Sequence, residues 1–125
     1  MDTIIICIDR DNDLGEKAQV PTPVIGRGAN VVAAVNLGTA DPEDSDTNTI
    51  FGGIKILDKL RSQGVDAEIV TFAGDKNVGV VSDRKIVEQL DSFLEIYEIK
   101  SAIFVSDGAE DEALIPIIQS RIKID

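Results

Sequence analysis

Acidic residues that directly follow apolar segments are the side chains of this chain best suited to chemistry. Asp9 and Asp11 come straight after the apolar residues 4–8, and Asp107 comes shortly after the apolar residues 102–105. Carboxylate oxygens are the ligands that hard cations such as Mg²⁺ prefer. Several carboxylates directed at one crevice repel one another, which raises their pKa values and favours a bound cation. We therefore predict that Asp9, Asp11 and Asp107 bind a divalent metal, with Mg²⁺ as the expected ion.

Other acidic residues have a simpler interpretation. The segment 41–46 is rich in Asp, but Asp, Ser and Pro are also the residues that form turns and cap helices. We interpret that segment as a turn followed by a helix N-cap. Asp75, which follows the second apolar segment, fits a surface turn and a site equally well.

Cationic and small residues near these carboxylates are the expected contacts of an anionic ligand. They are Arg10, Arg27, Arg84, Ser106 and Gly108. The glycines on either side of Arg27 precede a predicted helix, where backbone N–H groups can bind an anion. The arginines can equally pair with neighbouring aspartates, and the sequence contains neither a Walker A loop nor a complete dinucleotide fingerprint. The predicted partner is a small anionic ligand, a divalent metal or both.

Two known motifs can be compared with the first acidic loop. An EF-hand loop that began at Asp9 would need Gly and Glu where the chain has Leu14 and Val20, so that motif is excluded. An apolar strand followed by Asp-x-Asp resembles the opening of haloacid-dehalogenase-type phosphotransferases. In that comparison Asp9 is the nucleophile, Asp11 the acid/base and Ser106 part of the second motif. Asp13 stands where that family has a small or β-branched residue, and no lysine fits the family's later motif.

The composition excludes several classes of function. The chain has no histidine and one cysteine, Cys7, in an apolar run, which excludes His-based triads, zinc hydrolysis and thiol catalysis. A cysteine that cannot form an internal disulfide fits a reducing, cytosolic setting. The net charge of −11 disfavours nucleic acid and membrane surfaces, because affinity for these polyanions comes from Lys and Arg.

The expected fold must bring the acidic loops to one place. The apolar residues 4–8, 68–73 and 102–105 predict strands that are buried on both faces, as in parallel sheets. Helical periodicity predicts helices over 29–38, from about 45 to Gly64, from Ser82 or Asp83 to about 97, and over 111–119.

This order predicts one α/β domain over residues 1–125, with three layers and a mostly parallel sheet of about four strands between helices (Rossmann-like or flavodoxin-like). Residues 10–26 lack periodicity, and residues 121–125 look like the start of a fourth strand.

Five strings in the chain carry a family resemblance. They are CIDRDNDLG at 7–15, PVIGR at 23–27, ADPEDSD at 40–46, SDRK at 82–85 and FVSDGAED at 104–111. Together they resemble the archaeal family called domain of unknown function 373, described as predicted multi-pass membrane proteins. The resemblance implies that this chain is the soluble N-terminal part of a longer protein, on the cytoplasmic side of the cell membrane. The family brings no established activity or catalytic residues.

Three hypotheses for function remain open. The first is a cytosolic ligand- or metal-binding domain that senses a small molecule and regulates a membrane protein. The second is a Mg²⁺-dependent phosphoryl-transfer or phosphoester-hydrolysing enzyme. The third is a structural module that forms a homodimer, in which the acidic residues serve solubility.

Overall fold

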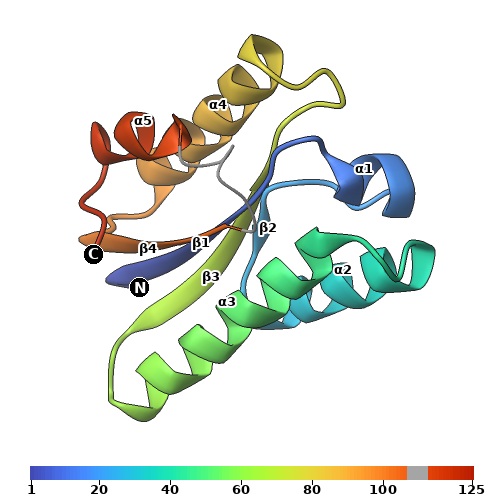
Figure 1. Ribbon diagram of the computed structural model, residues 1–125. Helices are drawn as coiled ribbons and strands as arrows, with labels where there is room; N and C mark the ends of the chain where they lie inside the picture. Colours follow the sequence, from blue (N-terminus) through green and yellow to red (C-terminus); the bar gives the residue numbers. More distant parts are fainter. Residues whose placement is uncertain (107–112) are drawn as a thin grey trace.

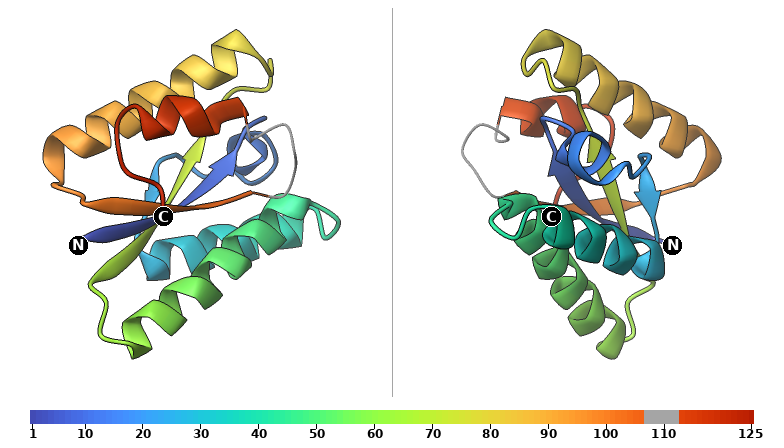
Figure 2. Two further views of the ribbon diagram at one scale, coloured as in Figure 1. Left: turned by 60° about the vertical axis from the view of Figure 1, so that its left-hand side comes forward. Right: turned by 90° about the vertical axis from the view of Figure 1, so that its right-hand side faces the viewer.

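The computed structural model describes residues 1–106 and 113–125, which form a central sheet between two layers of helices (Figures 1 and 2). The elements run in the order β1 (Thr3–Asp9), α1 (Asp13–Ala18), β2 (Val24–Ile25), α2 (Arg27–Ala40), α3 (Ser45–Ser62), β3 (Ala67–Ala73), α4 (Val80–Ile96), β4 (Ser101–Val105) and α5 (Ile115–Gln119). The α/β class and the three predicted strands are confirmed.

The sheet has the strand order β2-β3-β1-β4. β1 is central and pairs in parallel with both β3 and β4, so that Asp9 lies opposite Ala73 and Cys7 opposite Val105. The expectation of a mostly parallel sheet needs correction, because the edge strand β2 runs antiparallel to β3 and makes the sheet mixed. β2 has only two residues, too few to show any alternation in the sequence. Ile124 forms a parallel bridge with Ala102, as the expected strand start near the end of the chain requires.

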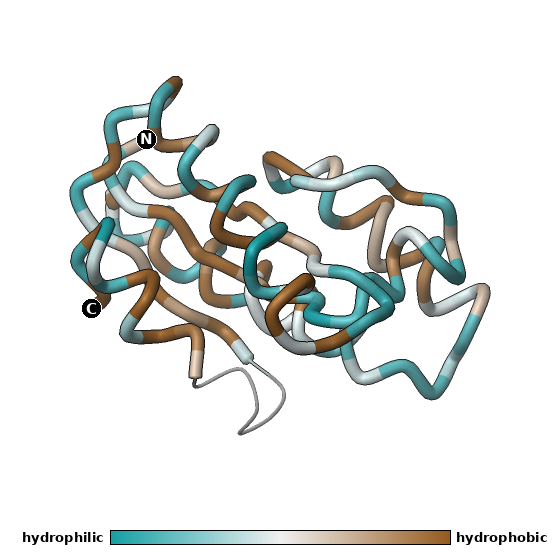
Figure 3. Tube along the Cα trace, turned by 90° about the horizontal axis from the view of Figure 1, so that it is seen from above, coloured by the Kyte–Doolittle hydropathy of each residue, from teal (hydrophilic) through white to brown (hydrophobic). Residues whose placement is uncertain are grey.

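Each face of the sheet carries its own apolar core. Ile4, Ile6 and Ile8 of β1 point to the face covered by α4 and α5, while Ile5 and Cys7 point to the face covered by α1, α2 and α3. A strand between two helical layers buries both sets of side chains, which explains its continuous apolar run. Hydrophobic residues accordingly concentrate in the central strands (Figure 3).

The two longest helices are placed by local signals and by packing. α3 ends where the sequence predicted, because Gly64 adopts a left-handed backbone with φ of 83° and its N–H donates to the carbonyl of Arg61. The expected start of α4 at Ser82 or Asp83 is wrong, since the helix begins at Val80. Ser82 is fully buried and its hydroxyl donates to the carbonyl of Arg10 instead of capping the helix.

The segment 10–26, which has no periodicity in the sequence, contains α1 and β2. Leu14 of α1 is fully buried and anchors this short helix to the core beside α2 and α3. The backbone N–H of Gly26 donates to the carbonyl of Ile69 at 2.8 Å, which fixes the end of β2 against β3. The segment between β1 and α2 is therefore fixed at two points, by Leu14 in the core and by the pairing of β2 with β3.

Candidate functional site

The loop after β1 is wound tightly by hydrogen bonds from its own backbone. Asp9 is buried, with 1% of its surface exposed, and its two carboxylate oxygens accept the N–H groups of Asp13 at 3.0 Å and Leu14 at 2.8 Å. Asn12 adopts a left-handed conformation, with φ of 59°, and its side chain accepts the N–H of Gly15. The Asp-Arg-Asp-Asn-Asp sequence thus turns back on Asp9 and caps the start of α1.

The carboxylates of Asp9, Asp11 and Asp13 in this loop are joined by that of Asp46, from the first turn of α3. Asp44 is the N-cap of that helix and accepts the N–H of Asp46 at 2.9 Å, which orients the first turn. One carboxylate oxygen from each of Asp9, Asp11, Asp13 and Asp46 lies within 4.8 Å of the others. We call these four residues the carboxylate cluster. Asp9 and Asp46 form its buried side and Asp11 its exposed side.

Two members of the carboxylate cluster, Asp9 and Asp13, have raised pKa values, mainly because they are buried. Burial raises the pKa of Asp9 to about 6, although hydrogen bonds from the Leu14 N–H and from Asp46 oppose the change. Burial, a hydrogen bond with Asp44 and the charge of Asp11 raise the pKa of Asp13 to about 7. Burial thus penalises the charge of both carboxyl groups at neutral pH, and for Asp13 the neighbouring carboxylates add to that penalty.

Lys17 on α1 supplies a positive charge next to the cluster. Its ammonium group lies 2.8 Å from carboxylate oxygens of Asp41 and Asp44 and 3.7 Å from Asp13. Burial works to raise the pKa of Asp44, but hydrogen bonds from Asp13 and Lys17 outweigh it and hold that pKa below its usual value. Lys17 therefore balances the neighbouring carboxylates, and the carboxylate cluster itself retains an excess of negative charge.

The donor set suits a hard divalent cation. Two ligands on opposite sides of an ion are separated by twice the metal–oxygen distance, about 4.1 Å for Mg²⁺ and about 4.6–5.2 Å for Ca²⁺. The four oxygens, all within 4.8 Å of one another, are close enough together to hold an ion of either size. A cation would replace the protons that the raised pKa values favour.

A groove of about 460 Å³ begins beside this loop. It is lined at one end by Asn12 and Gly74, and it runs along α4 from Lys85 to Tyr97, about 18 Å of helix. The far end is apolar and aromatic. None of the four cluster residues lines the groove; it reaches the same loop through Asn12, which stands between Asp11 and Asp13 in the sequence.

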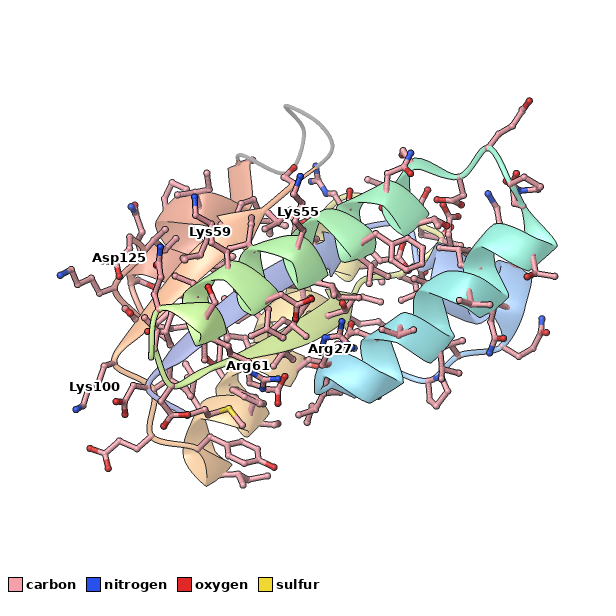
Figure 4. The ribbon with its side chains drawn as sticks, turned by 90° about the horizontal axis from the view of Figure 1, so that it is seen from below. Arg27, Lys55, Lys59, Arg61, Lys100 and Asp125 are labelled. Carbon is pink, nitrogen blue, oxygen red and sulfur yellow. The ribbon has the colours of Figure 1, made fainter. Side chains whose placement is uncertain are left out.

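The structure brings some predicted ligand contacts near the cluster and not others. Arg10 follows Asp9 but donates to Asp83 of α4 at 3.2 and 3.3 Å, so it connects the loop with that helix. Arg84 is exposed on α4. Arg27 lies at the other end of β3 and pairs with Asp58 at 2.8 Å, in the view from below in Figure 4.

The remaining predicted residues lie around the end of β4. Ser106 is half-buried directly after that strand. Asp107 and Gly108 lie outside the described residues, so their predicted roles stay predictions.

Three residues at this site were missed in the sequence. Asp13 was treated only as a mismatch to a motif, Asp46 as part of a turn, and Lys17 was not singled out. The two aspartates share one signal, an acidic residue at a helix start, because Asp13 and Asp46 both occupy the first turn of a helix. Nothing in the local sequence indicates that the two helix starts meet.

Among the residues that the structure describes, no helix combines the length and the apolar character needed to cross a membrane.

The chain is similar to uncharacterized proteins of two archaea. It is 57% identical to an uncharacterized protein of Archaeoglobus fulgidus, over 98% of this chain and 36% of the relative. It is 43% identical to an uncharacterized protein of Methanocaldococcus jannaschii, over 94% of this chain and 32% of the relative. The chain thus spans about a third of the length of these relatives. No solved structure matches it.

The family model described as "Domain of unknown function (DUF373)" matches residues 2–125. All five strings that carried the resemblance fall within the matched residues. The match covers nearly the whole chain, and the chain therefore belongs to the DUF373 family.

Proposed function

We propose that this domain binds a divalent cation, Mg²⁺ or Ca²⁺, at Asp9, Asp11, Asp13 and Asp46, and holds a small anionic ligand through that cation. The observation that carries the proposal is that four carboxylate oxygens lie within 4.8 Å of one another although they come from two segments far apart in the sequence, the end of β1 with its following loop and the start of α3. Acidic clusters are also common on surfaces without an ion. Here, however, two of the carboxylates are buried and two have raised pKa values, so bringing them together costs stability that a cation offsets.

The topology supports the same position. The chain leaves β1 towards β3 on one side and later returns to β4 on the other, with the connecting helices on opposite faces. In open α/β sheets of the flavodoxin-like kind, ligands bind at the carboxyl ends of the strands where this change of direction occurs. Asp9 ends β1 at that point. The neighbouring groove, with Lys85 near its polar end and Phe93 and Tyr97 further along, is the proposed place for the ligand.

A regulatory role follows from the position of the site between separate elements. A cation at the cluster would bridge the β1–α1 loop and the start of α3. A ligand can bias a protein only through different affinities for two arrangements, and a bridge between segments provides such a difference. We propose that the domain is the cytosolic part of a longer membrane-attached protein. This part of the proposal is supported by the family resemblance. It is also supported by the relatives, which are about three times as long as the part that this chain matches.

Thermal unfolding of the chain with added MgCl₂ or CaCl₂ tests the proposal, because a ligand of the native state raises the melting temperature by mass action. We expect a saturable rise for the wild type and its loss in Asp46→Asn. Asp66→Asn is the matched control, since Asp66 is an exposed carboxylate at the opposite end of β3 and its removal changes the net charge equally. An equal rise in all three proteins would contradict a specific site.

Hydrolysis of phosphoesters is a second candidate, favoured by one observation. Asp13 is only half-buried in the cluster, and if Asp9, Asp11 and Asp46 alone held the ion, Asp13 would be the carboxylate placed to accept a proton from a metal-bound water. Asp9 is poorly suited to act as the nucleophile, because both its oxygens accept backbone N–H groups and it is buried. Mg²⁺-dependent turnover of p-nitrophenyl phosphate that is lost in Asp13→Asn would support the enzyme. Cation binding without turnover supports the sensor.

A further inference from the structure

The groove that runs along α4, here called the α4 groove, has a polar end and an apolar end. Asn12, Thr22 and Lys85 line the end beside the loop after β1, and aliphatic and aromatic side chains of β2 and α4 line the other. Its volume of about 460 Å³ lies within the range of roughly 300–1,000 Å³ that is typical of small-molecule sites. A stable protein interface buries roughly 800 Å² of each partner, far more than a hollow about 18 Å long can cover. The dimensions therefore favour a small molecule.

The apolar end brings large exposed side chains from two elements into one hollow. Ile96 of α4 is 74% exposed and Ile25 of β2 is 38% exposed, and both line the α4 groove. Tyr97 is half-buried beside them, with its ring centre 4.7 Å from that of Phe93. A ligand that covers these side chains removes apolar surface from water, which drives apolar binding. This end of the groove therefore suits the apolar part of a ligand.

The polar end offers hydrogen-bond donors to a ligand. The side-chain oxygen of Asn12 accepts a backbone N–H of α1 at 3.1 Å, which leaves the amide hydrogens to be donated. The hydroxyl oxygen of Thr22 accepts the amide of Gln89 at 3.3 Å, which leaves the hydroxyl hydrogen. Lys85 has three N–H groups, and its nitrogen donates to Asp75 at 2.7 Å. The oxygens at this end are thus used within the protein, and hydrogens remain for a ligand that accepts them.

The charged residues of the lining do not select a ligand by themselves. Lys85 and Glu88 are the two charged residues that line the groove, and their charges offset each other. The donors of Asn12 and Thr22 decide instead, because a negatively charged acceptor forms the stronger hydrogen bonds with them. The proposed cation on the neighbouring loop favours a negative head in the same place.

We propose that the α4 groove binds an amphipathic anion, a carboxylate or phosphate on an unbranched apolar chain. The head lies at Asn12, Thr22 and Lys85, and the chain runs along α4 towards Ile96 and Tyr97. This inference deepens the proposed function and rests on it for the place of the ligand beside the cation-binding loop. An inorganic anion would leave the apolar end uncovered, and a neutral hydrocarbon would leave the donors of the polar end unpaired.

Tyrosine fluorescence can detect binding directly, because Tyr97 is the only tyrosine of a chain without tryptophan and it lines the groove. Octanoate, butyrate and octanamide are titrated below their micelle-forming concentrations, in EDTA and in MgCl₂. Four fully buried methylenes would strengthen binding about 200-fold, so in an open groove we expect octanoate to bind about 10-fold to 100-fold more tightly than butyrate. Octanamide, which keeps the chain and loses the charge, should bind about tenfold more weakly than octanoate. Octyl phosphate, titrated in the same way, distinguishes a phosphate head from a carboxylate head.

Ile96→Ser tests the place of the chain, and Val80→Ser is its matched control. The two residues are 74% and 75% exposed on the same helix, but Val80 does not line the groove. We expect Ile96→Ser to reduce the preference for octanoate over butyrate about threefold, since it removes apolar contact with the chain. Val80→Ser should bind like the wild type, and circular dichroism should show that both variants are folded.

The outcomes separate this inference from the proposed cation site. Octanoate that binds no more tightly than butyrate would overturn the inference, even where Mg²⁺ raises the melting temperature, and would leave the groove to a protein segment. An equal loss of the preference in Ile96→Ser and Val80→Ser would also overturn it, since the chain would then lie elsewhere. A preference that persists in EDTA while Mg²⁺ fails to stabilise the fold would support the groove and contradict the cation site alone.

Discussion

At the scale of single residues, opposing effects act on the charged carboxylates of the cluster. Asp9 accepts two backbone N–H groups, which stabilise its charged form, yet burial raises its pKa to about 6. Asp13 has fewer such partners and a pKa of about 7. Without a cation, the folded protein therefore holds protons at these sites in a range of pH where the unfolded chain has released them.

This difference in proton binding predicts an unusual dependence of stability on pH. A carboxyl group whose pKa is raised by folding stabilises the native state below its unfolded pKa of about 3.9, and this contribution is lost as pH rises through the folded value. For Asp9 and Asp13 the loss falls between pH 4 and their folded pKa values of about 6 and about 7. We expect the melting temperature in EDTA to rise as pH falls from 8 to 5.

Asp13→Asn should flatten that dependence, because it removes the group with the higher pKa. The carboxylates whose pKa values are lowered, Asp41 and Asp44 among them, titrate at still lower pH and leave this window unaffected. A melting temperature that falls steadily from pH 8 to 5 would contradict the raised values. With a saturating cation, the melting temperature should instead fall as pH falls from 8 to 5, since protons then compete with the bound ion.

Sequence reasoning identified half of the carboxylate cluster. Asp9 and Asp11 were found because a buried strand in front of them is visible as an apolar run. Asp46 belongs to a segment rich in cap and turn residues, and Asp44 is indeed the N-cap. The contribution of Asp46 depends on how α3 lies across the sheet, which no local pattern specifies.

At the scale of elements, the position of α3 depends on one glycine. A methyl group on Gly53 would lie 2.8 Å from the sulfur of Cys7 and 2.9 Å from a methyl of Ile69, whereas one on Gly52 would meet nothing within 4 Å. Gly53 thus lets the helix lie directly on β1 and β3. Of these two neighbouring glycines, only Gly53 is a point of close packing.

The two glycines should respond oppositely to the same substitution. Gly53→Ala forces the helix away from the sheet, and we expect it to lower the free energy of unfolding by about 1–3 kcal/mol. Gly52→Ala removes only the entropic cost of a helical glycine and should raise it by up to about 1 kcal/mol. Urea denaturation measures both. Equal effects would show that Gly53 is not a point of close contact.

Local sequence patterns predicted three of the strands but neither β2 nor the start of α4. Strands β1, β3 and β4 were predictable because strands buried on both faces are continuously apolar. β2 was not, because its two residues are placed by pairing with Val70 and Thr71 of β3. The start of α4 was misplaced because Ser82 resembles an N-cap but is used in a tertiary hydrogen bond to Arg10.

At the scale of the whole molecule, the loop after β1 is connected to both helical layers. Asp9, Asp11 and Asp13 meet Asp46 of α3 on one face of the sheet. Arg10, between Asp9 and Asp11, pairs with Asp83 of α4 on the other face, and its carbonyl accepts the Ser82 hydroxyl. A cation that orders this loop would therefore affect helices on opposite sides of β1.

Hydrogen exchange can detect that connection. We expect a saturating divalent cation to slow backbone exchange in the β1–α1 loop and the first turn of α3, which carry the cluster, and also in the first turn of α4. The end of α4 near Tyr97 should not change. Local opening there involves none of the bridged residues, and protection reports the free energy of such local opening.

The Arg10→Ala variant distinguishes protection at the cation site from protection transmitted to α4. The variant keeps all four carboxylates of the cluster, so protection of the loop and of α3 should persist, while protection at the start of α4 should be lost. Its loop also loses a positive charge, which should strengthen cation binding if it changes it at all. If α4 stays protected in Arg10→Ala, the signal passes through the hydrogen bond from Ser82 to the residue-10 carbonyl, which the variant keeps, or through the packed core, and not through the Arg10–Asp83 pair.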